Sequence, residues 1–115
     1  MSDPEKFKKG MELAATLFPN QQASADLPPD FIRHTVGHLF GDVWQGEGVE
    51  LKQRSLITCS VLVALNREAE QRLHFVGARN LGIPRSEIEA AITHIAHYAG
   101  SVSYTHLTLP TIYSV

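Results

Sequence analysis

The chain has 115 residues, of which 43% are hydrophobic and 19% charged, and its ten basic and twelve acidic side chains give a formal net charge of −2. This length favours one domain, and the small net charge gives no electrostatic footprint for nucleic acid or for an anionic membrane. The single cysteine, Cys59, excludes a disulfide framework and any Cys-x-x-Cys pair.

The N-terminal half predicts two helices. Its first residues contain no apolar run of the signal-peptide kind, so we expect a cytoplasmic protein. Apolar residues at helical spacing predict a helix over residues 4–17, and residues 19–29, rich in Pro, Asn, Gln and Ser, predict a loop. Asp30 can cap a second helix, which carries apolar residues as far as Phe40 and ends in a glycine-rich turn.

The C-terminal half predicts three more helices, over residues 50–65, residues 67–81 and the segment after Pro84. Residues 56–65 are apolar nearly all round, so we expect the third helix to be central and buried. Its β-branched residues leave a strand as the alternative, but its length and lack of alternation favour a helix. Gly82 can serve as the C-cap of the fourth helix. The whole pattern predicts an all-α fold, a small helical bundle.

Residues 102–111 differ in character from the rest of the chain. They are β-prone, contain no Lys, Arg, Asp or Glu, and abruptly end a helical pattern. They resemble the translation of a transposase-type sequencing adapter, which would begin at Ser101. We therefore expect a domain over residues 1–100, a non-native tail over residues 101–115 and a missing final helix. A genuine C-terminal strand is the alternative.

Six short segments together carry a resemblance to a known family. They are residues 40–44 (FGDVW), residues 51–58 (LKQRSLIT), Leu73-His74, residues 80–84 (NLGIP), Glu87-Ile88 and residues 97–100 (HYAG). In this order and spacing they resemble the carboxymuconolactone decarboxylase family. The resemblance implies an all-α fold of the alkylhydroperoxidase D type and a homo-oligomer, either a trimer or a hexamer.

That family contains two chemistries. One is a peroxidase reaction that uses a Cys-x-x-Cys pair, and the other is the decarboxylation of 4-carboxymuconolactone to an enol-lactone in the protocatechuate (β-ketoadipate) route of aromatic catabolism. Counting back from His74, the redox cysteines would fall at Arg67 and Glu70. Without thiols there is no thiolate nucleophile, so we do not expect peroxidase activity. The resemblance implies a carboxy-lyase that needs no metal and no organic cofactor.

Arg67, Glu70 and His74 lie at positions i, i+3 and i+7 of the fourth predicted helix and therefore share one face. A carboxylate and an imidazole one turn apart can exchange a proton or orient one another. We expect Glu70 and His74 to be catalytic, with His74 giving a proton or stabilising an oxyanion. Arg54 or Arg67 would hold a substrate carboxylate. A solvated surface pair is the alternative interpretation of Glu70 and His74.

His34, His38 and Asp42 also recur at four-residue steps. A metal-binding stripe is one interpretation. The resemblance favours a wall of the substrate pocket, with His38 and Trp44 as substrate-binding residues, although packing is the other interpretation of Trp44. Another small-molecule enzyme, or a non-catalytic oligomeric binding protein on the same scaffold, stays open as an alternative function.

Overall fold

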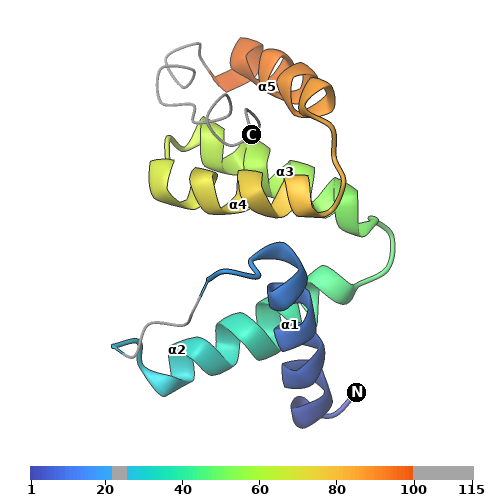
Figure 1. Cartoon of the computed structure of the whole chain (residues 1–115), viewed down its shortest axis with the longest axis vertical. Coiled ribbons are helices and arrows are strands. Elements are labelled where there is room, and N and C mark those ends of the chain that lie inside the picture. The colour runs from blue at the N-terminus through green and yellow to red at the C-terminus, as the bar shows by residue number, and fades with distance from the viewer. Residues whose placement is uncertain (22–25, 100–115) are drawn as a thin grey trace. The chain divides into compact units, whose positions relative to one another are not determined.

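The computed structural model describes residues 1–21 and 26–99. Their regular elements are all helical, so the all-α prediction is confirmed (Figure 1). None of these helices is long and apolar enough to cross a membrane. The predicted tail, residues 101–115, lies outside the described residues. The elements are α1 (Asp3–Leu17), α2 (Pro29–Arg33), the π-helix η1 (His34–Phe40), the 3-10 helix η2 (Val43–Gln45), α3 (Leu51–Ala64), α4 (Glu68–Asn80) and α5 (Arg85–Ala99).

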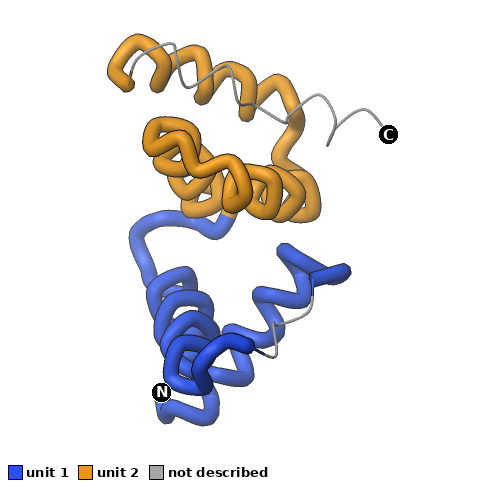
Figure 2. The backbone as a smooth tube through the Cα atoms, turned by 90° about the vertical axis from the view of Figure 1, so that its left-hand side faces the viewer, with its two compact units in different colours: residues 1–51 blue, residues 52–115 orange. Residues whose placement is uncertain are grey.

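The chain divides into two compact units, Met1–Leu51 and Lys52–Val115 (Figure 2). In the first unit, α1 begins at the N-cap Ser2, whose hydroxyl accepts a hydrogen bond from the Glu5 N–H at 3.3 Å. The predicted helix over residues 4–17 is confirmed. A Cβ on Gly10 would lie 1.9 Å from the Val36 carbonyl oxygen. The glycine therefore allows a close backbone crossing between α1 and η1.

The second predicted helix is present but changes its geometry. It begins at Pro29 as the α-helix α2, and from His34 to Phe40 it widens into the π-helix η1. The widened turns lie where α1 crosses, because the Val36 carbonyl faces Gly10. π-helical turns are rare and are frequent at functional sites, so this segment is relevant to the search for a site.

Three aromatic side chains form the centre of the first unit. The rings of Phe18 and Phe40 meet edge to face with centroids 6.0 Å apart, and the Phe40 and Trp44 rings lie 5.7 Å apart. All three side chains are buried. Such aromatic contacts add to the burial of large apolar surfaces. The core of this unit is thus largely aromatic.

In the second unit, α3 and α4 form a helical hairpin with a well-defined turn. Asn66 has a φ of 58°, and its N–H donates to the Val63 carbonyl. The Arg67 N–H donates to the Leu62 carbonyl at 2.9 Å. These two bonds make a Schellman motif, which ends α3. The Gln71 amide, fully buried, also donates to the Leu62 carbonyl, at 3.2 Å, and fastens α4 to the end of α3.

α4 ends in the same way. Gly82 has a φ of 84° and donates to the Arg79 carbonyl, while the Ile83 N–H donates to the Ala78 carbonyl at 3.1 Å. The positive φ is what favours glycine at this position. The prediction that Gly82 is the C-cap of this helix is confirmed.

The core of the second unit is aliphatic, and α3 contributes only one face to it. That face carries Ser55, Cys59 and Val63, which are all buried. Ile57, Val61 and Leu65 on the other side are 53%, 48% and 63% exposed, so the prediction that α3 is buried all round is wrong for this structure. The reason is that α4 and α5 supply the partners of a single stripe of α3. The core cluster is Cys59, Val63, Phe75, Ala78, Ile83, Ile88 and Ile92.

Candidate functional site

The structure brings Arg67, Glu70 and His74 together at the start of α4. Arg67 is the N-cap residue, and its guanidinium Nη2 donates to Glu70 Oε1 at 2.8 Å. The side chains of Arg67 and Glu70 are 59% and 43% exposed, so this ion pair is open to solvent. His74 is partly buried one turn further along the helix. Side-chain exposure therefore decreases across the site, from the exposed arginine to the partly buried imidazole.

The two titratable groups of this site have opposite charge states at neutral pH. The pKa of Glu70 is lowered, first by a hydrogen bond from its own backbone N–H and then by the hydrogen bond from Arg67. Burial lowers the pKa of His74 to about 4, although the Glu70 carboxylate beside it acts in the other direction. Near pH 7 the site thus holds a carboxylate next to a neutral imidazole.

α3 lies directly behind His74. The Cys59 thiol donates to the His74 backbone carbonyl oxygen with an Sγ–O distance of 3.4 Å. Burial raises the pKa of this thiol to about 12, so it stays protonated. A buried, protonated thiol is a poor nucleophile, which argues against peroxide chemistry at Cys59.

Arg54 lies on α3, and the register of the hairpin places it along α4. Cys59 faces His74, and Lys52 Nζ lies beside the backbone of Gly82, so α3 and α4 run antiparallel. In this register Arg54 stands opposite a residue about five positions beyond His74, or about 7 Å along the axis at 1.5 Å per residue. Only the length of its side chain can bring the guanidinium toward His74. Its role in holding substrate stays a prediction.

His38 and Trp44 both belong to the first unit. Trp44 is only 7% exposed in the aromatic core, which accounts for it as a packing residue; its predicted contact with substrate stays untested. His38 lies in η1, exposed, with Nδ1 4.0 Å from Asp42 Oδ2. Lys6 Nζ holds the same Asp42 oxygen at 3.1 Å. Among the residues that the structure describes, no group of three or more His, Cys, Asp or Glu side chains could hold a metal ion.

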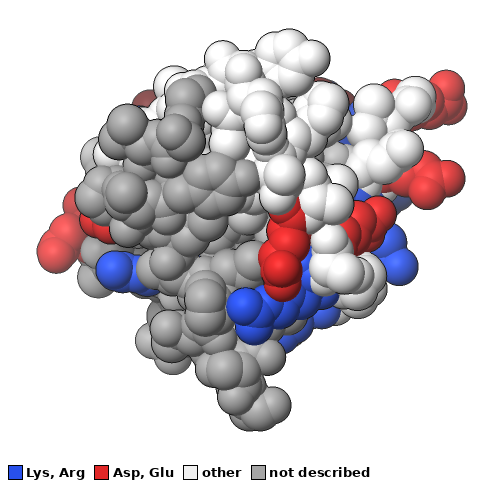
Figure 3. Space-filling model, turned by 90° about the horizontal axis from the view of Figure 1, so that it is seen from above, with Lys and Arg blue, Asp and Glu red and all other residues white. Residues whose placement is uncertain are grey.

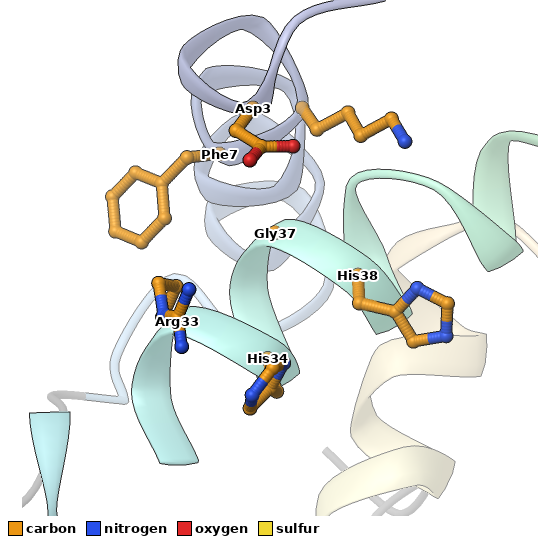
Figure 4. Close-up of a pocket in the computed structure, with 7 residues that line it drawn as sticks. Asp3, Phe7, Arg33, His34, Gly37 and His38 are labelled. Atoms are coloured by element: carbon orange, nitrogen blue, oxygen red, sulfur yellow. The ribbon is translucent and has the colours of Figure 1, made fainter. Parts of the chain in front are cut away.

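His38 lines a small pocket between α1 and the helix that crosses it. Asp3 and Phe7 come from α1, and Arg33, His34, Gly37 and His38 come from α2 and η1 (Figure 4). The cavity volume is about 170 Å³, below the roughly 300–1,000 Å³ of typical ligand sites. Its cations are already balanced, since Arg33 pairs with Asp30 and Lys6 with Asp42. The Glu70–His74 site is therefore the stronger candidate.

Where Figure 3 shows charged side chains of described residues, acidic and basic ones lie next to one another rather than in patches of one sign. A nucleic-acid site would need a basic patch.

The sequence does not reveal one contact of this site. Cys59 lies in the apolar third helix, and its thiol is 2% exposed. Its hydrogen bond to the His74 carbonyl depends on the register of the α3–α4 hairpin. No local pattern in the sequence reports that register.

Comparison with known proteins now adds to this geometry. The sequence profile of the carboxymuconolactone decarboxylase family matches residues 29–110. The 4-carboxymuconolactone decarboxylase of Acinetobacter baylyi is 31% identical over 106 residues, which cover 87% of this chain and 79% of that protein. The chain belongs to the carboxymuconolactone decarboxylase family.

The family match contains all six predicted site residues, and it extends past residue 100 into the segment outside the described residues. A second relative of this chain is the nitrosuccinic acid decarboxylase of Metarhizium robertsii. It is 41% identical over 64 residues, which cover 56% of this chain and 45% of the relative. The chain thus spans less than half the length of that protein. Both relatives are decarboxylases that act on different acids.

Proposed function

We propose that this protein is a carboxy-lyase that decarboxylates 4-carboxymuconolactone or a related acid at Glu70 and His74, without a cofactor. The observation that carries the proposal is the pairing of an ionised carboxylate with a neutral, partly buried imidazole on one face of α4. Two relatives that are decarboxylases support the reaction class.

The two acids named by the relatives share a carbon skeleton, and this suggests the substrate class. In each, the carbon that loses CO₂ also carries a –CH₂–COO⁻ arm and an electron-accepting group: a nitro group in nitrosuccinate, and the unsaturated lactone in 4-carboxymuconolactone. Both are thus succinates substituted at carbon 2. We propose that this chain acts on the same class, with one carboxylate lost and the other retained.

The reaction needs few groups from the protein. The bond between carbon 2 and its carboxylate breaks, CO₂ leaves, and the electron pair passes into the accepting group, whose oxygen becomes negative. A proton from water then reaches carbon and completes the product. A hydrogen-bond donor aimed at that oxygen lowers the barrier most effectively when it stands in place beforehand.

His74 suits this role as a neutral donor. With a pKa of about 4 its imidazole carries one N–H at neutral pH and no charge, so it can donate to the developing oxyanion. Glu70, as a carboxylate, can orient the ring but has no proton to give. Of the two roles expected for His74, the oxyanion partner is therefore the one we propose.

Arg67 is our first candidate for the retained carboxylate. One of its donors is bonded to Glu70, but a guanidinium has five N–H groups in a planar fork. The side chain is 59% exposed, so an incoming acid can reach it. Arg54 is the second candidate, because it lies further from Glu70 along the hairpin.

The test is decarboxylation by the full chain of both acids, followed as lactone absorbance or released CO₂. We expect Glu70→Gln and His74→Gln to lower kcat/KM by about 100-fold or more, the usual range for a lost oxyanion donor or acid–base partner. The control is Glu89→Gln, which breaks the comparable exposed pair of Glu89 with Arg85 on α5 and should keep full activity.

Two outcomes contradict the proposal. Full activity in both site variants would remove Glu70 and His74 from the mechanism. Saturable binding of both acids by the wild-type chain with no CO₂ released would favour the non-catalytic binding protein instead.

A further inference from the structure

The face of α3 behind His74 contains a buried thiol among its apolar side chains. Cys59 is 2% exposed, and its thiol donates to the His74 carbonyl oxygen at 3.4 Å. This contact joins α3 to α4 at the turn that bears the candidate imidazole. It therefore acts on the site without touching a substrate.

The thiol stays a donor throughout the working pH range. Burial raises its pKa to about 12, so Sγ keeps its proton. A helical carbonyl oxygen has two lone pairs and can accept from the thiol as well as from the N–H of its own helix. Because an S–H group is a weak donor, the contact matters for the position it fixes rather than for its strength.

Ser55 is a second buried polar residue on this face of α3, one turn before Cys59. It is 1% exposed, and among the described residues its hydroxyl oxygen has no hydrogen-bond partner. Burying an unpaired polar group costs free energy. The polar side chains of Ser55 and Cys59 therefore do more at this position than occupy space in the core.

The properties of His74 depend on how closely its turn approaches α3. Burial is the largest cause of its lowered pKa. A turn that moved away from α3 would admit water to the imidazole and remove part of that burial. The Cys59 contact is made at the backbone of His74 itself, so it can limit this movement directly.

We propose that Cys59 is a positioning residue, whose thiol ties the His74 turn of α4 to α3 and so fixes how deeply the imidazole is held. The proposal rests on the proposed function only for its consequence in catalysis. It assigns no nucleophilic or redox step to the thiol.

The test is an NMR titration of the His74 imidazole in the full chain and its variants. Cys59→Val keeps an apolar side chain but removes the donor, and we expect the pKa of His74 to rise by about half a unit or more toward its ordinary value. Cys59→Ser retains a donor and should stay close to the wild type.

Val63→Ala is the matched control. Val63 lies one turn further along the same face and is equally buried, but it is an apolar side chain with no donor. We expect this variant to lower the thermal midpoint and to leave the pKa of His74 unchanged. A general loosening of the core would move both quantities.

The proposal is overturned if Cys59→Val leaves the pKa of His74 unchanged, or if Val63→Ala shifts it equally. Should Cys59→Val fail to fold, Cys59→Ala removes the same donor and gives the same comparison. The readout needs no turnover. If Glu70 and His74 variants keep full activity while Cys59→Val still shifts His74, the proposed function fails and the positioning role stands.

Discussion

His74 and Glu70 are residue types that commonly transfer protons, but in this site neither is in the protonated form that a general acid needs. Burial lowers the pKa of His74 to about 4, and hydrogen bonds lower the pKa of Glu70. At neutral pH neither group has a readily lost proton. A reaction rate that depended on imidazolium would rise as pH falls through 6.5. If His74 acts as a neutral donor, we expect a rate that does not change with pH in that range.

The same burial makes the folding stability depend on pH. The pKa of His74 is about 4 in the folded chain and about 6.5 when unfolded, so the unfolded chain binds the extra proton between these values. The contribution of the His74 imidazole to folding stability is complete above pH 6.5 and is lost as pH falls toward 4. The loss amounts to about 2–3 kcal/mol of unfolding free energy.

Urea unfolding at a series of pH values measures this loss. His74→Gln should flatten the fall between pH 6.5 and 5, while the control His97→Gln, which removes an exposed imidazole of α5, should retain it. An equal slope in wild type and His74→Gln would show that the imidazole is hydrated in the folded chain.

At this scale the sequence predicted which side chains share a face but not what surrounds them. The spacing of Arg67, Glu70 and His74 was sufficient, because a helix fixes the angle between neighbours. The burial of His74 depends on α3, which packs from behind. The register of the hairpin depends on the Schellman turn at Asn66, which, unlike the glycine at the end of α4, carried no recognisable signal.

Among the elements, the strongly periodic helices α1 and α4 were predicted with nearly correct bounds, and the start of α5 after Pro84 was also predicted correctly. The widening of the second helix at η1 was not predicted, because it coincides with the crossing of α1 rather than with any local sequence feature. The exposed face of α3 was also missed. An apolar composition shows that a helix has apolar faces, not how many of them find partners.

The crossing of α1 with η1 gives a prediction for two glycines. A Cβ on Gly10 would lie 1.9 Å from the Val36 carbonyl oxygen, whereas a Cβ on Gly37 would meet only the Phe7 ring, at 4.0 Å. We expect Gly10→Ala to lose about 2–3 kcal/mol of unfolding free energy, since the backbones must separate. Gly37→Ala should gain about 0.5–1 kcal/mol from its lower chain entropy.

Thermal unfolding of the two variants measures the difference. Each places alanine at a glycine of the same helix pair, so the contrast between them isolates the crossing from helix propensity. Equal thermal midpoints for Gly10→Ala and Gly37→Ala would mean that α1 does not approach η1 as closely as the structure places it.

Across the whole chain, the two compact units have separate cores of different kinds. The first depends on an aromatic cluster around Phe40, and the second on aliphatic side chains around Phe75. The single domain predicted over residues 1–100 stays a prediction. Helical periodicity assigns side chains to a core-facing side but does not say which core they join, so it does not report two cores.

The chain carries a natural probe in each core. Trp44, its one tryptophan, is buried in the first unit, and Cys59, its one cysteine, is buried in the second. Tryptophan fluorescence and the reaction of the thiol with an aromatic disulfide reagent therefore report the two units separately along one urea series. Because each unit has its own core, we expect two transitions whose midpoints differ.

Two substitutions assign the transitions to the units. Among the described residues, the first unit buries the large apolar side chains Leu13, Leu17, Phe18, Phe40 and Trp44, and the core cluster of the second consists of other residues, with Leu56 and Ile95 packed against it. Val63→Ala should lower only the thiol midpoint, and Phe18→Leu only the fluorescence midpoint. Coincident midpoints that moved together in both variants would show instead that the two cores unfold as one cooperative body.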